Sequence, residues 1–299
     1  MLLNQIEELP EEMANCVNLE LLRIAANQLT AIPQWLFELP KLSWVAFAGN
    51  PATHQVQSNT AIEAFHWDEF SVKELLGEGA SGFISKATWK VKQEAVAIKV
   101  FKGAVTSDGL PEDEMKVAIA AGIHENLIQI LGKVAGHPEQ KSGLIMELIS
   151  SSYINLGHPP SMETCTRDVF DAQAVYAGEE LLKIAKSMAS VCAQLHRKGI
   201  NHGDLYAHNI LVNKTADSLL GDFGAASFYA INSALAPNIE RVEVRAFGCL
   251  VEDVFNLVPK EALHNELRIQ WQQLIAACTL SKVKDRLSFS EIVAELNQF

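Results

Sequence analysis

A polar loop joined to short apolar runs restricts the possible folds of this chain more than any other feature of its sequence. Residues 202–212 have the sequence HGDLYAHNILV, and residues 219–224 have the sequence LLGDFG. Asp204 and Asp222 are eighteen residues apart, Asn209 stands between them, and an apolar run of strand length adjoins each group. The order of such groups along a chain is more specific than any one of them, so the motifs that precede them decide the interpretation.

A glycine-rich segment precedes the polar loop. Gly77, Gly79 and Gly82 form a G-x-G-x-x-G pattern between two strand-like runs. Glycine lets the backbone turn sharply and brings N–H groups close to phosphate oxygens. Alone the pattern is weak, because glycine-rich hairpin turns are common and no helix follows it as in a dinucleotide-binding loop.

A lone lysine follows the glycine-rich segment. Lys99 lies within the apolar run AVAIKV, where burial of an ammonium group is costly without a partner. Residues 111–122 predict a helix, with proline first, acids in the first turn and glycine at the end. We choose Glu114 over Glu112 as the partner of Lys99, because Glu114 adjoins the apolar face of this helix. The alternatives are a lysine that reaches solvent and acids that only offset the helix dipole.

Together these motifs resemble the protein kinase family, over residues 68–299. The resemblance implies an α+β fold with two lobes: a small antiparallel β lobe with one helix at about residues 68–146, and a large, mainly helical lobe at about residues 150–299. It also implies ATP and Mg²⁺ as cofactors and a protein substrate. Residues 244–248 fit the long central helix of the large lobe, where Glu243 replaces the usual aspartate.

The resemblance also assigns roles to the residues named above. The glycine-rich loop would cover the phosphates of ATP. Lys99, paired with Glu114, would hold the α- and β-phosphates, and Asp204 would accept a hydrogen bond from the attacking hydroxyl. Asn209 and Asp222 would hold Mg²⁺. The chemistry favours these residue types independently, since a triphosphate carries about four negative charges and Mg²⁺ prefers oxygen ligands.

Six further residues would surround the adenine ring by the same resemblance. The side chains that would enclose the ring are Ile84, Ala97 and Leu211. Met146 would be the gatekeeper between the lobes. The backbones of Glu147 and Ile149 would meet the edge of the adenine.

Several positions depart from the family pattern. Gly203 stands where the family has an arginine that binds a phosphorylated activation segment, and Tyr206 stands where it has a lysine near the transferred phosphoryl group. The Ala-Pro-Glu motif ends in Asn238, so Arg286 loses its expected carboxylate partner unless Glu240 replaces it.

The activation segment between the two motifs is short. Its hydroxyl groups belong to Ser227, Tyr229 and Ser233, and no cationic cluster lies nearby in the sequence. A phosphate without an arginine partner gains little. We therefore predict an activity that does not depend on phosphorylation of this segment.

Three functional classes are compatible with the sequence. The first is an ATP-dependent protein kinase, with Ser/Thr preferred over Tyr only as a prior, since residues 205–208 match neither pattern. The second is a small-molecule phosphotransferase, because the His-Gly-Asp form of the loop resembles the aminoglycoside and choline kinases. The third is a pseudokinase scaffold, which the missing lysine and glutamate favour. The intact phosphate and metal ligands favour the first class.

Residues 1–52 contain a repeat of 23 residues. The shift aligns Asn27 with Asn50 and several apolar positions, and residues 19–29 resemble a leucine-rich repeat. About two turns are too few for a stable solenoid, so either further repeats precede them or they lean on the domain that follows. In the second case we expect the apolar face to be partly shared with the small lobe. The expected role is a structural cap or a protein-binding surface. Residues 53–67 are the predicted linker, because they are mostly polar and lack a period.

Composition limits the partners and the compartment. The net charge of −12 gives no electrostatic footprint for nucleic acid. The five cysteines are far apart and form no C-x-x-C pair, which indicates neither a zinc site nor a disulfide framework. The N-terminus does not resemble a signal peptide, and no apolar run is long enough to span a membrane. We expect a cytoplasmic protein.

Overall fold

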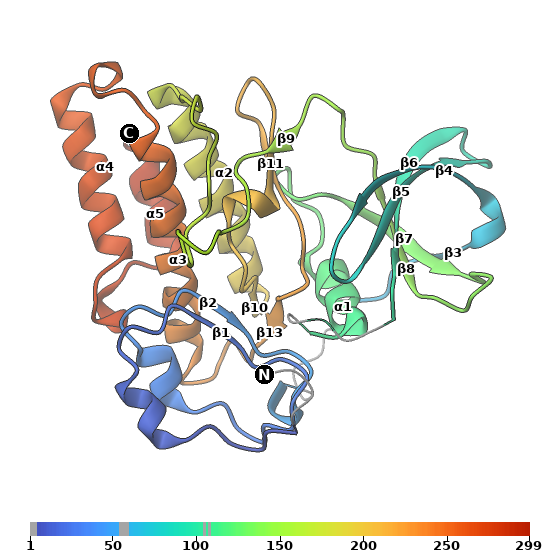
Figure 1. Ribbon diagram of the computed structural model, residues 1–299, viewed down its shortest axis with the longest axis horizontal. Coiled ribbons are helices and arrows are strands. Elements are labelled where there is room, and N and C mark those ends of the chain that lie inside the picture. Colours follow the sequence, from blue (N-terminus) through green and yellow to red (C-terminus); the bar gives the residue numbers. More distant parts are fainter. Residues whose placement is uncertain (1–4, 54–59, 104–105, 107–108) are drawn as a thin grey trace.

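The computed structural model describes residues 5–53, 60–103, 106 and 109–299. Figure 1 shows three parts: the N-terminal segment, defined as residues 5–53, a lobe built around a sheet (the small lobe) and a helical lobe (the large lobe). Residues 1–4 of the predicted repeat region and residues 54–59 of the predicted linker lie outside the described residues. In the described part of the chain, no helix is both long enough and apolar enough to cross a membrane.

The N-terminal segment consists of short elements with a regular spacing. Its strands are β1 (Leu21–Arg23) and β2 (Trp44–Ala46), and its 3₁₀ helices are η1 (Glu11–Asn15), η2 (Gln34–Glu38) and η3 (Pro51–Thr53). The two strands pair in parallel with Leu22 opposite Val45. The 23-residue period of the sequence is therefore the register of this pair.

Two asparagines connect the successive turns of the segment. Asn27 Nδ2 donates to the carbonyl oxygens of Ile24 and Ala25, both at 3.1 Å. Asn50 Nδ2 donates to the Ile24 oxygen at 3.0 Å, and its Oδ1 accepts the Leu29 N–H at 3.1 Å. Both asparagines are buried, so they satisfy backbone groups that water cannot reach.

The small lobe is a six-stranded sheet with one helix, α1 (Pro111–Ala121). The strand order is β3-β7-β8-β6-β5-β4. All neighbouring strands are antiparallel except β3 and β7, which are parallel. The 3₁₀ helix η4 (Trp67–Glu69) joins β3 to β4, and the strands are β3 (Ala64–His66), β4 (Phe70–Glu78), β5 (Gly82–Trp89), β6 (Glu94–Phe101), β7 (Ile130–Ala135) and β8 (Gly143–Glu147).

The linker is shorter than predicted. Residues 53–67 were expected to lack regular structure, but β3 lies inside this range and adds an edge strand to the small lobe. Phe65 packs edge-on against Trp89, with ring centroids 4.5 Å apart. This aromatic contact stabilises a strand that is too short for a visible alternation in the sequence.

The large lobe is built from four helices and several short strands (Figure 1). The helices are α2 (Gly178–Arg197), α3 (Ala236–Asn256), α4 (Asn265–Cys278) and α5 (Phe289–Leu296). The strands are β9 (Ile154–Asn155), β10 (Ile200–Asn201), β11 (Ile210–Val212), β12 (Ser218–Leu220) and β13 (Ser227–Phe228). The 3₁₀ helices are η5 (Ala207–Asn209), η6 (Lys260–Ala262) and η7 (Val283–Asp285).

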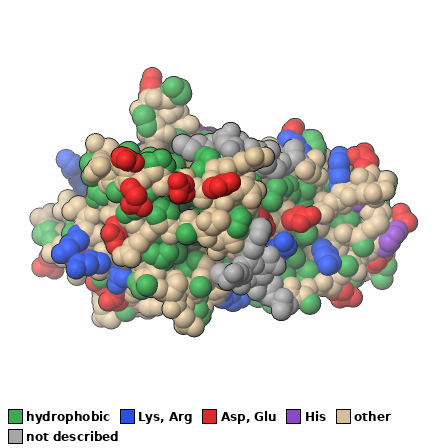
Figure 2. All heavy atoms as spheres, turned by 90° about the horizontal axis from the view of Figure 1, so that it is seen from below, with side chains coloured by type: hydrophobic (Ala, Val, Ile, Leu, Met, Phe, Trp, Pro, Cys, Tyr) green, Lys and Arg blue, Asp and Glu red, His purple; other side chains and the backbone are tan. Residues whose placement is uncertain are grey.

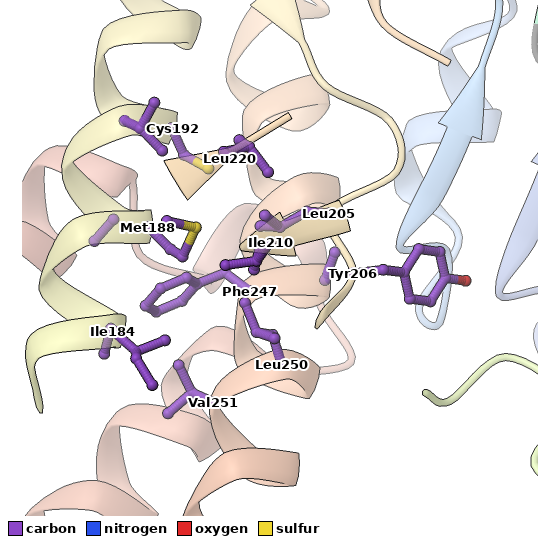
Figure 3. Close-up of a cluster of buried hydrophobic side chains, with 14 of the residues drawn as sticks. Ile184, Met188, Cys192, Leu205, Tyr206, Ile210, Leu220, Phe247, Leu250 and Val251 are labelled. Atoms are coloured by element: carbon purple, nitrogen blue, oxygen red, sulfur yellow. The ribbon is translucent and has the colours of Figure 1, made fainter. Parts of the chain in front are cut away.

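The large-lobe core holds the loop between β10 and β11 in place. Helices α2 and α3 supply Met188 and Phe247 to this core, and the loop supplies Leu205. Figure 3 shows Leu205 among these side chains, whereas Tyr206 points away toward the strands of the N-terminal segment. Successive loop residues therefore anchor to different parts of the molecule.

The N-terminal segment packs mainly on the large lobe, whereas we predicted an apolar face partly shared with the small lobe. One apolar cluster joins Leu22, Val45 and Phe47 of the segment to Tyr229 and Val242 of the large lobe. Figure 1 shows the blue segment beside β10, β13 and the nearby end of α3. The apolar residues that cover this cluster come from residue 229 and helix α3.

The segment also approaches the start of α1. A Cβ added at Gly49 would lie 2.9 Å from Asp113 Oδ2, and one added at Gly109 would lie 3.6 Å from the Ala25 Cβ. The segment therefore touches both lobes.

Figure 2 views the molecule from the side of this segment, where acidic side chains are spread over the left part of the face.

Candidate active site

The glycine-rich turn joins β4 to β5 at the tip of a hairpin. The Gly79 N–H donates to the Gly82 oxygen at 3.0 Å and closes the turn. A Cβ at Gly82 would lie 2.6 Å from the Val100 oxygen, whereas one at Gly77 or Gly79 would meet nothing within 4 Å. Close packing against β6 thus requires Gly82, and the other two glycines leave room for a ligand to approach the backbone.

Strand β6 brings Lys99 to helix α1. Its Nζ forms a hydrogen-bonded ion pair with Glu114 Oε1, and the two residues are only 7% and 4% exposed. Burial raises the pKa of Glu114, the Lys99 charge opposes this, and the Asp222 charge adds to it. The structure therefore joins Lys99 to Glu114 rather than Glu112, and it brings the Asp222 carboxylate within electrostatic range of the pair.

The loop before β11 brings Asp204 and Asn209 together. Asn209 Nδ2 donates to both the Asp204 backbone oxygen and Asp204 Oδ2, each at 2.9 Å. The Gly221 N–H donates to the Asn209 backbone oxygen at 3.0 Å, which places Asp222 directly beside this loop. Asp222 is exposed, and its Oδ1 accepts the Gly224 N–H at 3.1 Å.

The donor atoms of this group fit a magnesium ion. Asn209 uses its amide nitrogen on Asp204, so its amide oxygen is left for another ligand. Together with the exposed Asp222 carboxylate this gives the oxygen ligands that Mg²⁺ prefers. The described residues hold no cluster of three or more His, Cys, Asp or Glu side chains able to bind a metal. Mg²⁺ characteristically completes its shell with water and phosphate oxygens.

The six residues expected around the adenine come from both lobes and from the segment that joins them. Ala97 of β6 is opposite Met146 of β8, and Leu211 lies on β11 of the large lobe. The remaining three are Ile84 on β5, Glu147 at the end of β8, and Ile149 in the segment after β8. The Glu147 N–H donates to the Gln129 oxygen at 3.0 Å, so that N–H already has a partner.

Comparison with known proteins decides the family. Residues 70–245, more than half of the chain, match the model of the protein kinase domain. This chain belongs to the protein kinase family. The family predicted from the order of the motifs is thereby confirmed, and the two-lobed α+β architecture agrees with it.

Several curated kinases are similar to this kinase. A probable serine/threonine-protein kinase of Dictyostelium discoideum is 32% identical over 177 residues, which are 57% of this chain and 10% of the relative. The liver/testis phosphorylase b kinase gamma catalytic chain of Bos taurus is 26% identical over 158 residues, 53% of this chain and 38% of the relative. The serine/threonine-protein kinase mos of Gallus gallus is 27% identical over 205 residues, 63% of this chain and 57% of the relative. The matched region thus spans less than two thirds of each relative.

Glu243 anchors the catalytic loop of the kinase from helix α3. Its Oε1 accepts the Gly203 N–H at 2.6 Å, and its Oε2 accepts the His202 N–H at 3.1 Å. His196 Nε2 lies 2.8 Å from the same Oε2. Burial raises the pKa of Glu243, but the hydrogen bond and charge of His196 lower it by more, so the net shift of the pKa is downward. The glutamate thus takes the place of the expected aspartate with its hydrogen bonds satisfied.

Asp168 is a second anchor, and sequence analysis missed it. Its carboxylate accepts the Ala207 N–H and contacts His208 Nδ1 at 2.7 Å. Burial lowers the pKa of His208, but the hydrogen bond to Asp168 outweighs it and the net shift is upward. Residues 159–176 show no period or motif, so no signal in the sequence pointed to this residue.

Arg286 has a different set of partners from the one predicted. It donates to the backbone oxygens of Leu280, Arg241 and Pro40 at 2.8, 2.9 and 2.7 Å. Glu240 does not replace the missing glutamate, because its Oε1 accepts the Phe289 N–H at 2.8 Å instead. Burial, with the nearby Arg245 charge, lowers the pKa of Arg286 to about 10. The Pro40 oxygen of the N-terminal segment thus accepts a hydrogen bond from Arg286, whose expected partner in the family is the motif glutamate.

The N-terminal segment also reaches the catalytic loop, which sequence analysis did not predict. Arg23 Nη1 donates to the Gly203 oxygen at 3.1 Å, and Arg23 Nη2 forms an ion pair with Asp204 Oδ1. Trp44 stacks on Tyr206, with ring centroids 4.4 Å apart and an interplanar angle of 8°. Arg23 and Trp44 lie on the face of β1 and β2 opposite to that of Leu22 and Val45. A repeat pattern does not reveal what this face contacts.

The large lobe and the docked segment together leave room only for glycine at position 203. Gly203 has a φ of +74°, and an added Cβ would lie 2.6 Å from the Val45 oxygen and 2.7 Å from the Ala225 oxygen. No arginine fits there while β2 is in place. The departure from the family pattern therefore agrees with the left-handed backbone and with both neighbouring oxygens.

Two of the three hydroxyl groups of the activation segment are buried. Ser227 is fully buried, and its Oγ accepts the Phe47 N–H at 3.2 Å. Tyr229 is 6% exposed, its hydroxyl lies 2.8 Å from His196 Nδ1, and burial raises its pKa. Only Ser233 of the three is partly accessible.

Proposed function

We propose that this chain is an ATP- and Mg²⁺-dependent protein kinase that transfers the γ-phosphoryl group of ATP to Ser or Thr hydroxyls of proteins. The observation that carries the proposal is the buried Lys99–Glu114 ion pair, formed within electrostatic range of Asp222. A buried ion pair is expensive to maintain for stability alone. Its retention beside an exposed carboxylate supports a site that neutralises phosphate charge.

Each residue has a defined task in this proposal. Glu114 holds the Lys99 side chain by the ion pair, and Lys99 would contact the phosphates. Asn209 and Asp222 would hold Mg²⁺, which neutralises charge on the phosphate oxygens when bound. Asp204 accepts a hydrogen bond from the attacking hydroxyl and orients it toward the phosphorus. The glycine-rich hairpin excludes water from above the phosphates.

A pseudokinase remains the alternative that a specific observation favours. Tyr206 removes the lysine of the catalytic loop, and its ring is committed to stacking on Trp44. A small-molecule phosphotransferase has weaker support, which rests on the His-Gly-Asp form of the loop. The serine/threonine preference is supported by the names of the Dictyostelium and Gallus relatives.

One experiment separates these classes. The full chain is incubated with Mg²⁺ and ATP labelled at the γ-phosphate, together with a mixed protein substrate or a panel of small alcohols. We expect label on protein Ser and Thr, and its loss in Asp204→Asn and Asp222→Asn. Label on small alcohols alone would point to the phosphotransferase. No transfer despite calorimetric binding of Mg-ATP would show a pseudokinase.

We also propose that the N-terminal segment is two turns of a leucine-rich-repeat solenoid. The parallel register of β1 with β2 and the hydrogen bonds of Asn27 and Asn50 support it. Its strand face is covered by its own large lobe, so the proposed role is a structural cap rather than a surface for another protein. The five free cysteines, three of them buried, support a reducing compartment such as the cytoplasm.

A further inference from the structure

Arg23 connects the N-terminal segment to the Asp204 carboxylate. It lies on β1, where its backbone is paired with Ala46 of β2. One guanidinium nitrogen donates to the Gly203 oxygen at 3.1 Å, and the other forms the ion pair with Asp204. The planar fork of arginine therefore holds two consecutive residues of the loop at once. A lysine, with a single charged nitrogen, does not reproduce this geometry.

The two carboxylate oxygens of Asp204 have different partners. Asn209 Nδ2 donates to Oδ2 at 2.9 Å, and Arg23 Nη2 contacts Oδ1. The carboxylate is thus fixed in rotation from both sides. The Asp204 side chain is still 16% exposed, and an ionised carboxylate accepts more than two hydrogen bonds. An incoming hydroxyl group therefore still has a site on Asp204.

The catalytic loop has no cation of its own for this purpose. Gly203 lacks a side chain, and Tyr206 points toward the N-terminal segment (Figure 3). His208 is paired with Asp168 instead. Across residues 5–53, 60–103, 106 and 109–299, the cation in ion-pair contact with Asp204 is Arg23.

The docking contacts argue against an alternative in which Arg23 inhibits the site and leaves it when the N-terminal segment undocks. Asn201 Nδ2 donates to the Val45 oxygen at 3.1 Å, and the Phe47 N–H donates to Ser227 Oγ at 3.2 Å, both buried. Undocking would break these bonds and expose the apolar cluster that the segment shares with the large lobe. Arg23 is therefore held beside Asp204 as a permanent part of the site.

We propose that Arg23 is a positioning residue for phosphoryl transfer, supplied to the catalytic loop by the N-terminal segment. It holds the Asp204 carboxylate in the orientation that receives the attacking hydroxyl. This inference rests on the proposed protein kinase activity. Because orientation acts on the transfer step and not on nucleotide binding, its loss lowers kcat and leaves the affinity for Mg-ATP unchanged.

The test compares three variants of the full chain with the wild type: Arg23→Gln, Arg23→Lys and Ser43→Ala. Ser43 is the matched control, because its Oγ accepts from Arg245 Nη1 at 2.6 Å across the same docking surface without touching the catalytic loop. For each protein kcat, KM for ATP, the calorimetric Kd for Mg-ATP and the melting temperature are measured. Arg23→Gln is expected to lower kcat by about 10- to 100-fold, with Kd and melting temperature unchanged. Arg23→Lys is expected to recover part of the rate, and Ser43→Ala to keep it.

The outcomes are distinct. A wild type that transfers phosphoryl groups but is unaffected by Arg23→Gln overturns the inference and leaves the proposed function standing. A higher kcat in Arg23→Gln overturns it in favour of an inhibitory contact. Equal losses of kcat and melting temperature in Arg23→Gln and Ser43→Ala overturn it in favour of a purely structural role. A wild type without transfer activity overturns the proposed function and the inference together.

Discussion

At position 203 the docked N-terminal segment leaves no space for a side chain. Gly203→Ala places a Cβ against two backbone oxygens, those of Val45 and Ala225, at a φ of +74°. The left-handed conformation alone costs about 1–2 kcal/mol, and the overlaps add to it. We expect chemical denaturation to show a loss of about 2 kcal/mol or more in the free energy of unfolding.

The matched control for this substitution is Gly79→Ala. An added Cβ at Gly79 meets nothing within 4 Å, and its φ is not in the left-handed region. Its unfolding free energy should stay within about 0.5 kcal/mol of the wild type. Equal stability of Gly203→Ala and Gly79→Ala would contradict the described backbone and packing at position 203.

The Lys99–Glu114 pair gives a second prediction at single residues. In the proposed function Lys99 contacts the phosphates of ATP, so Lys99→Met should lower phosphoryl transfer by about 10²- to 10³-fold. It also leaves Glu114 buried without its partner, which costs about 3–5 kcal/mol. Adding Glu114→Gln should restore stability but not activity, as seen by comparing melts with transfer rates. Recovery of activity in the double variant would contradict the role of Lys99.

We expect the activity not to depend on phosphorylation of the activation segment, unlike in the family pattern. Ser227 and Tyr229 are buried against the N-terminal segment and helix α2, so a protein kinase cannot reach their hydroxyls in the folded chain. We expect phosphatase treatment and Ser233→Ala each to leave the transfer rate within about twofold of untreated wild type. A drop of about tenfold, or 1.4 kcal/mol in the barrier, in either sample would show that phosphorylation is needed.

Elements with a strong local pattern were predictable from the sequence. The helix with Pro111 first and glycine at its end forms as α1, and the central helix forms as α3 around residues 244–248. The lone lysine in an apolar strand indicated a buried partner, and the structure joins it to Glu114. Strand β3 was missed because three residues carry no measurable alternation.

Contacts between distant segments were not predictable in the same way. Asp168 and Arg23 both hold the catalytic loop, from 36 residues before Asp204 and from 181 residues before it respectively. No sequence pattern assigns either residue to the catalytic loop, because tertiary packing brings them to it. Two departures from the family pattern lie at such contacts. The Val45 oxygen lies close to Gly203, where the family has an arginine. The Pro40 oxygen accepts a hydrogen bond from Arg286, whose family partner, a glutamate, is replaced by Asn238.

At the scale of the whole molecule, the N-terminal segment and the two lobes form one packed unit. The segment shares an apolar cluster with the large lobe, donates Arg23 to the catalytic loop and approaches the start of α1. The apolar side chains of the segment are covered by residue 229 and helix α3 of the large lobe. Stability and catalysis are therefore expected to depend on the segment together.

The most direct measurement is to cut the linker of the folded chain. A protease site inserted after residue 56 lets the protein fold intact and then be cleaved, and size-exclusion chromatography and phosphoryl transfer are followed before and after cleavage. The account predicts that both pieces elute together with the rate unchanged, and that the kinase piece, once separated, loses about tenfold or more in rate. Spontaneous separation of the pieces with an undiminished rate would contradict it.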